Sequence, residues 1–122
     1  MVSDGDFAKM WIADRILFFV YKSIDLIDIK RAKIIVKQRL EIQNEVAYPV
    51  FCDLRAVNNA QKEARDYLAI EGSLMTKALA ILVKDEHAKV ILDMYLSTTV
   101  VKIPTQIFLD RDKALSFLNA YK

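Results

Sequence analysis

The stretch "FCDLRAVNNAQKEARDYL" (residues 51–68) passes from an apolar strand through a polar loop into a charged helix. Its first letters are typical of a buried strand, and its last eight carry charged and apolar residues at helical spacing. Asn58 and Asn59 suit a turn between the two, because asparagine tolerates left-handed backbone geometry. A strand, a loop and a helix in this order form the repeating unit of α/β proteins.

The rest of the chain repeats this unit on both sides of the stretch. Aromatic and β-branched runs that flank Asp14 and Arg15 predict a β-hairpin, and a long helix follows it. Pro49 marks the entry to the next strand, and two further strand–helix pairs come after the opening stretch. The predicted strands are residues 7–13, 16–22, 50–54, 77–83 and 105–110, and the predicted helices are 23–45, 60–75, 85–98 and 111–122.

The order β-β-α-β-α-β-α-β-α predicts a single α/β domain over residues 1–122, with a mainly parallel sheet flanked by helices. Ser23 or Asp25 is expected to cap the long helix, whose inner face would carry apolar residues from Leu26 to Leu40. We expect the Met and aromatic residues to form ordinary core packing rather than a ligand cavity; these are Met10, Trp11, Phe18, Phe19, Met75, Met94 and Tyr95.

Composition narrows the class of protein. Hydrophobic residues make up 54% of the 122 residues and charged residues 28%, which is a globular balance. The net charge of +2 gives no reason to expect a nucleic-acid partner. Lys30, Lys33 and Lys37, with Arg31 and Arg39 nearby, are expected to form a solvated helix face.

Location is predicted from what the sequence lacks. The single cysteine fits a reducing compartment, and the N-terminal residues show no signal peptide. No apolar run approaches the roughly 20 residues that a membrane span needs. We therefore expect a cytoplasmic protein without a membrane span.

The residues available for chemistry are few. His87 is the only histidine and Cys52 the only cysteine, so zinc-type ligand spacing and the usual nucleophile pairs are missing. The two glycines form no phosphate-binding motif. We expect a protein that is not an enzyme and needs no cofactor or metal, with a solvated His87 and an inert buried Cys52.

The most polar loop of the predicted sheet follows the strand at 50–54. Loops at the carboxyl ends of parallel strands share one edge, where binding sites concentrate. This edge would also carry Lys84 and Asp85 after one strand, and Asp110 and Arg111 after another. We predict that a partner binds here, through Asn58, Asn59, Lys62, Glu63 and Arg65.

At this junction the chain resembles a STAS domain, the SpoIIAA-like fold of bacterial anti-anti-sigma factors. The element order matches over nearly the whole chain, and the strand "VFCDL" ends in Asp-Leu as in that family. The segments "KEARDYLAIEGS" (62–73) and "PTQIFLDRDKAL" (104–115) resemble an uncharacterised STAS-like group common in Bacteroidetes. The resemblance implies a regulatory module that binds another protein.

The chain departs from the switching members of that family at the start of the helix. Where they carry a phosphorylatable hydroxyl, this sequence has Gln61, Lys62, Glu63 and Ala64. We therefore expect a constitutive docking surface rather than a phosphorylation switch. Glu63 would place a fixed negative charge near the position of the missing phosphate.

Two functions follow as alternatives. The first is a non-enzymatic protein-interaction module with a protein partner, for which a homodimer is plausible in size. The second is a small hydrophobic-ligand or lipid-binding protein, because STAS domains share their βα architecture with Sec14-like lipid-transfer domains. We expect a chain of this length to leave little volume for a lipid.

Overall fold

Six strands form one mixed sheet, in which each strand lies beside its neighbours in the sequence. The computed structural model describes residues 2–99 and 101–122. β1 to β3 pair antiparallel, whereas β3 to β6 pair parallel. The strands are β1 (Val2–Asp4), β2 (Ala8–Ala13), β3 (Ile16–Tyr21), β4 (Tyr48–Asp53), β5 (Thr76–Leu82) and β6 (Thr105–Phe108).

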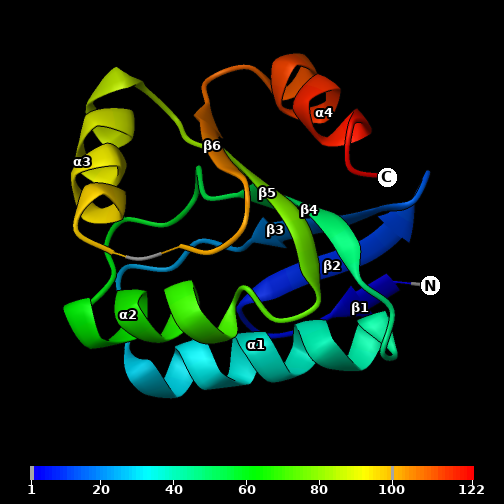
Figure 1. Cartoon of the computed structure of the whole chain (residues 1–122). Coiled ribbons are helices and arrows are strands. Elements are labelled where there is room, and N and C mark those ends of the chain that lie inside the picture. Colours follow the sequence, from blue (N-terminus) through cyan, green and yellow to red (C-terminus); the bar gives the residue numbers. More distant parts are fainter. Residues whose placement is uncertain (1, 100) are drawn as a thin grey trace.

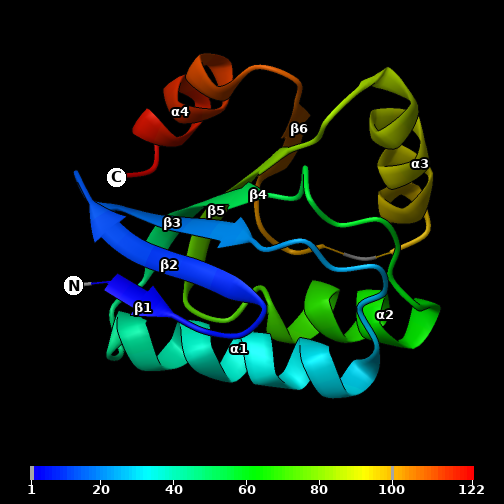
Figure 2. The same ribbon diagram turned by 180° about the vertical axis from the view of Figure 1, so that it is seen from behind.

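Three helices connect the parallel strands, and a fourth ends the described chain. Parallel crossovers are almost always right-handed, so consecutive crossovers that proceed in one direction place their helices on one face of the sheet. α1, α2 and α3 accordingly lie on one face and α4 on the other (Figures 1 and 2). The helices are α1 (Ile29–Gln43), α2 (Lys62–Glu71), α3 (Glu86–Ser97) and α4 (Arg111–Asn119).

The hairpin between β2 and β3 confirms the prediction at Asp14 and Arg15. Both residues have positive φ angles, 50° and 61°, which is the geometry of the two-residue turn that matches strand twist. Two non-glycine residues thus supply the turn without a glycine.

The strands divide their side chains between the two faces. In β4, Val50 and Cys52 face the three-helix side, whereas Phe51 packs with β3 and α4 on the opposite side. In β5, Ile81 and Leu82 make the same division. Because these strands are covered on both faces, they appear in the sequence as continuous apolar runs.

The predicted helix at 23–45 is too long at its start. α1 begins only at Ile29, and the carboxylate of Asp28, rather than Ser23 or Asp25, caps it by accepting a hydrogen bond from the backbone N–H of Arg31 at 2.9 Å. Residues before the cap are extended and bond to the loop after β4, with Ile24 opposite Val57. The two buried residues of this segment, Ile24 and Ile27, are three positions apart, which is also a spacing typical of a helix.

Other differences concern the edge strand and several side chains. β1 was not predicted, since its sequence "VSD" has no strand pattern. Met75 and Met94 are exposed rather than core residues. Arg39, expected on a solvated face, is only 3% exposed.

Arg39 is buried because it donates hydrogen bonds to backbone carbonyls at the C-terminal end of α2. Its guanidinium donates to the backbone carbonyls of Leu74 at 2.9 Å and of Glu71 and Gly72 at 3.3 Å each. It also donates to the side-chain oxygens of Gln43 and Thr76. The positive charge thus lies at the negative end of a helix, where a cation is stabilised.

Candidate functional site

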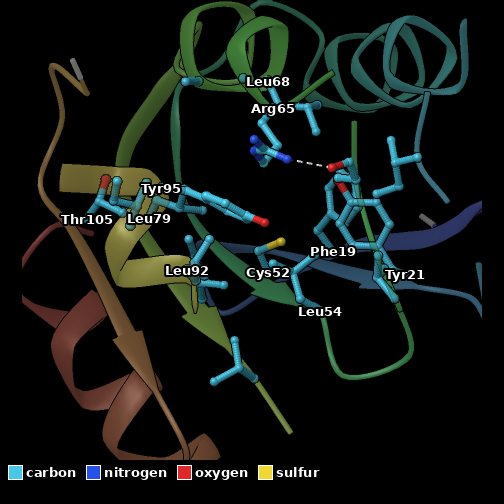
Figure 3. A pocket seen from close by; sticks show the side chains of 18 of the residues that line it. Phe19, Tyr21, Cys52, Leu54, Arg65, Leu68, Leu79, Leu92, Tyr95 and Thr105 are labelled. Atoms are coloured by element: carbon cyan, nitrogen blue, oxygen red, sulfur yellow. Dashed lines mark hydrogen bonds between the residues drawn. The ribbon is translucent and has the colours of Figure 1, made fainter. Parts of the chain in front are cut away.

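A cavity of about 590 Å³ lies between the sheet and the helices of the three-helix face. Figure 3 shows it from close by, with side chains of the strands and of α2 and α3 converging on it. The space is partly open to solvent, so it is a cleft between sheet and helices rather than a sealed internal void. Small-ligand sites typically have volumes of about 300–1,000 Å³.

The floor of the cavity is apolar and comes from alternate residues of the strands. β4 and the residue after it contribute Val50, Cys52 and Leu54. β5 and the residue after it contribute Leu79, Ile81 and Val83. Because strand side chains alternate between faces, this regular set is what one face of a parallel pair presents.

The walls of the cavity come chiefly from α2 and α3. α3 directs Ala88, Leu92 and Leu96 toward Ile81, Val83 and Ile107 of the sheet, yet none of the residues of this helix is fully buried. The apolar residues of α3 are only half-buried because the space between this helix and the sheet is not filled by side chains.

The side chain of Arg65 reaches from α2 to α3 at this wall. The guanidinium carbon of Arg65 lies 3.8 Å from the centre of the Tyr95 ring, a close cation–π contact. Arg65 Nη1 also donates a hydrogen bond to the carbonyl of Ala60 at 2.6 Å (Figure 3). Arg65 is therefore fixed in place by its own loop and by an aromatic ring of α3.

Two other polar groups border the cavity. Cys52 is half-buried rather than fully buried, and the desolvation of its thiol, helped by the nearby Asp53, raises its pKa to about 12. Burial also holds the pKa of the Tyr21 hydroxyl well above its ordinary value. Both groups are thus neutral at physiological pH, and Cys52 lacks the thiolate that a nucleophile or a metal ligand would need.

A family profile matches most of this chain. The profile of a domain of unknown function (DUF7793) covers residues 10–122. The chain belongs to this family. The match begins within β2 and so includes the parallel part of the sheet, the four helices and the cavity.

The fold of this DUF7793 domain also occurs in a solved structure. The crystal structure of an uncharacterised protein of the DUF3478 family, with a SpoIIAA-like fold, from Shewanella loihica PV-4 superposes with a TM-score of 0.64. The alignment covers 95% of this chain and 98% of that chain at 12% identity, so it shows the fold alone. It confirms the STAS-like fold predicted from the sequence. No curated protein matches the chain significantly.

The structure divides the five predicted partner-binding residues of the DUF7793 domain into two groups. Asn58, Asn59 and Arg65 line the cavity. Lys62 and Glu63 do not; the Lys62 ammonium is ion-paired with Asp66 at 2.8 Å, and Glu63 lies in the exposed first turn of α2. Three of the predicted residues therefore border the cavity, and the other two lie on the outer face of α2.

Asn58 and Asn59 also shape the loop itself. The Asn58 amide donates to the carboxylate of Asp25 at 3.0 Å, which joins this loop to the extended segment before α1. The Asn59 side chain accepts from the backbone N–H of Ala60 at 2.8 Å. Both contacts hold the loop in position beside the cavity.

The Asp-Leu pair that supports the STAS resemblance has a local role here. Asp53 is 7% exposed, and its carboxylate accepts hydrogen bonds from the backbone N–H, Nε and Nη2 of Arg55 at 2.8–3.2 Å. This bidentate pair fixes the turn that leaves β4.

Sequence reasoning missed the cavity. Of the Met and aromatic residues considered for a cavity, only Phe19 and Tyr95 line it. His87 and Lys84 lie on its lining as well, and His87 is exposed, as expected. One signal in the sequence could have indicated the cavity. The predicted helix at 85–98 has a long apolar face, and the short strand β6 beneath it cannot cover all of that face.

The described residues offer neither a metal-binding cluster nor a helix that could span a membrane. Residues 2–99 and 101–122 contain no group of three or more His, Cys, Asp or Glu side chains that are placed to hold a metal ion. None of the helices within these ranges combines the length and the apolar character needed to cross a bilayer.

Proposed function

We propose that this DUF7793 domain is a non-enzymatic cytoplasmic module that binds a small, largely apolar molecule between its sheet and helices α2 and α3. The observation that supports this most strongly is the 590 Å³ cavity with an apolar floor. The volume lies in the range of drug-sized ligands.

The incomplete burial of α3 supports the same function. Leu92 and Leu96 face the cavity but remain half-buried, as does the Tyr95 ring. An apolar ligand would remove these side chains from water and so gain about 25 cal/mol for each Å² that it covers. Binding would therefore stabilise α3 against the sheet.

Titration with Nile red, a neutral apolar dye, tests the proposal. We expect saturable fluorescence enhancement with one site per chain. Ala88→Trp, which places an indole in the cavity, should abolish it, because Ala88 lies on the lining. Val90→Trp is the matched control, since Val90 lies on the same helix with 51% exposure and should leave dye binding unchanged.

The result that overturns the proposal is equally specific. If Nile red shows no saturable binding, or if it binds Ala88→Trp as well as the wild type while both proteins keep their melting temperature, the cavity is not a ligand site. Native mass spectrometry of the protein purified from its own cells then serves as a second readout. A bound small molecule retained by the wild type and lost in Ala88→Trp supports the proposal.

Docking of a protein partner stays a prediction. Lys62 and Glu63 remain accessible on the outside of α2. Lys62→Glu or Glu63→Lys should abolish capture of a partner from the native cell with little change in melting temperature. Unchanged capture, or loss of the fold, counts against this second function.

A further inference from the structure

The lining of the cavity is one-sided in charge. Among the described residues of the lining, the charged side chains are those of Arg39, Arg65 and Lys84, His87 lies beside them, and none is Asp or Glu. The charge of the whole chain is almost balanced, with 18 Lys and Arg residues against 16 Asp and Glu residues. Composition alone therefore does not explain why every charged side chain of the lining is basic. Inside a space with apolar walls, such charges act over a longer range than in water.

Arg65 is the cation of the lining whose position suits a ligand. Among the described residues, its guanidinium donates one hydrogen bond, to the Ala60 carbonyl, and stacks on the Tyr95 ring. A guanidinium has five N–H donors, and none of the ion pairs among the described residues includes Arg65. Stacking covers one face of the group and leaves its N–H edges for an acceptor.

Arg39 differs from Arg65 in this respect. Its terminal nitrogens already donate to the carbonyls at the end of α2 and to Gln43 and Thr76. The guanidinium of Arg39 therefore maintains the fold, whereas that of Arg65 still has N–H donors available for a ligand.

Tyr21 adds an independent observation. Its side chain is only 6% exposed, lines the cavity, and makes no hydrogen bond to the described residues. Every fully inaccessible side-chain nitrogen or oxygen among these residues does have a partner. The Tyr21 hydroxyl therefore borders open space, and a buried hydroxyl in that position calls for an acceptor.

We infer that the ligand is an apolar molecule with a carboxylate head group, that the head group pairs with Arg65, and that the Tyr21 hydroxyl donates a second hydrogen bond to the ligand. The planar N–H edge of Arg65 matches the two oxygens of a carboxylate. The absence of acidic side chains from the lining removes the repulsion that an anion would otherwise meet. This inference rests on the proposed function and specifies its ligand class.

Displacement of Nile red by four single-chain compounds tests the head group. Dodecanoate, dodecyl phosphate, dodecanol and dodecyltrimethylammonium share one apolar chain and differ in charge. We expect dodecanoate to displace the dye at a concentration at least about tenfold lower than dodecanol does, as a charge-assisted hydrogen bond allows. The cationic compound should be the weakest.

Variants assign the preference to residues. Arg65→Met should reduce the advantage of dodecanoate over dodecanol to less than about threefold. The ratio is taken within the variant, so that a change in apolar binding from loss of the Tyr95 contact affects both compounds alike. Tyr21→Phe, which keeps the ring, should reduce that advantage by a smaller factor. Lys62→Met is the matched control, because Lys62 lies one turn away on the same helix, outside the lining, and should keep the full preference.

The outcomes separate this inference from the function on which it rests. Equal displacement by dodecanoate and dodecanol in the wild type overturns the carboxylate head group but leaves apolar binding intact. Stronger displacement by dodecyl phosphate overturns the carboxylate in favour of a phosphate. Failure of Nile red itself to bind overturns both. Retention of the preference in Arg65→Met refutes the role of Arg65.

Discussion

Arg65 of α2 and Tyr95 of α3 are in direct contact, with the guanidinium carbon 3.8 Å from the centre of the ring. The two helices lie on the same face of the sheet and are not connected in sequence, because β5 intervenes. This contact therefore couples the position of α3 to that of α2 across the cavity.

The first prediction concerns this coupling. Tyr95→Leu removes the cation–π contact but keeps an apolar side chain, so the free energy of unfolding should fall by about 0.5–2 kcal/mol. Backbone amides of α3 should then exchange hydrogen faster, whereas those of α1 should not change. Met94→Leu is the control, because Met94 is 63% exposed. An unchanged exchange rate in Tyr95→Leu would contradict the coupling.

The second prediction concerns the buried Arg39. Arg39→Met leaves the carbonyls of Glu71, Gly72 and Leu74 without these donors, and each buried unsatisfied group costs about 1–3 kcal/mol. Urea unfolding should show a loss of at least about 1–3 kcal/mol. Lys30→Met on the exposed side of α1 should change stability by less than about 0.5 kcal/mol. Equal effects of the two variants would show that Arg39 does not anchor α2.

The third prediction concerns the reactivity of Cys52. Its pKa of about 12 lies about three units above the ordinary value of 9.0, so the thiolate fraction at pH 7–8 should be about a thousandfold lower than in a free thiol. Reaction with a disulfide reagent, followed by absorbance, should be correspondingly slow and should rise about tenfold per pH unit. The urea-unfolded protein provides the fast reference. Rapid modification of the folded protein at pH 7 would refute the burial argument.

The fourth prediction concerns alkaline pH. The folded state holds the protons of Cys52 and Tyr21 more tightly than the unfolded chain does, since both pKa values are raised. The contribution of these two groups to stability should therefore be constant below about pH 9 and fall as pH rises, first through Cys52 and then, above pH 10, through Tyr21. In Tyr21→Phe the decline above pH 10 should be shallower when melting temperature is measured. A decline identical to that of the wild type would exclude Tyr21 as its cause.

The fifth prediction concerns phosphorylation. The helix start has no hydroxyl between Gln61 and Ala64, and the Ser73 hydroxyl already donates to the carbonyl of Ala69 at 2.7 Å. Incubation with ATP and native lysate, followed by mass spectrometry, should give no stoichiometric phosphate on Ser73 or Thr76. Stoichiometric phosphate that alters partner binding would refute the constitutive surface.

The order of the elements was predictable from the sequence because their signals are local. Continuous apolar runs such as "VFCDL" are typical of strands covered on both faces, and each was found as a strand. The start of α1 was not predictable in this way. Ile24 and Ile27 have helical spacing, but the loop after β4 supplies their hydrogen bonds, and that pairing is non-local.

The candidate site was predictable only in part, for a related reason. The parallel topology predicted Asn58, Asn59 and Arg65 at the edge of the sheet, and the structure has them on the cavity lining, while their role as binding residues stays a prediction. The cavity depends on how far α2 and α3 stand from the sheet, which no single segment encodes. The burial of Arg39 likewise depends on carbonyls more than thirty positions away in the sequence.

The strand order β1-β2-β3-β4-β5-β6 has a consequence for synthesis of the chain. Each strand pairs with the one made just before it, so no strand must later insert between two that are already in place. Folding during translation proceeds from the N-terminus, and here the sheet can grow by one strand at a time as the chain leaves the ribosome. The cavity, which needs β5, α3 and the residues up to Thr105, is then the last part of the three-helix face to form.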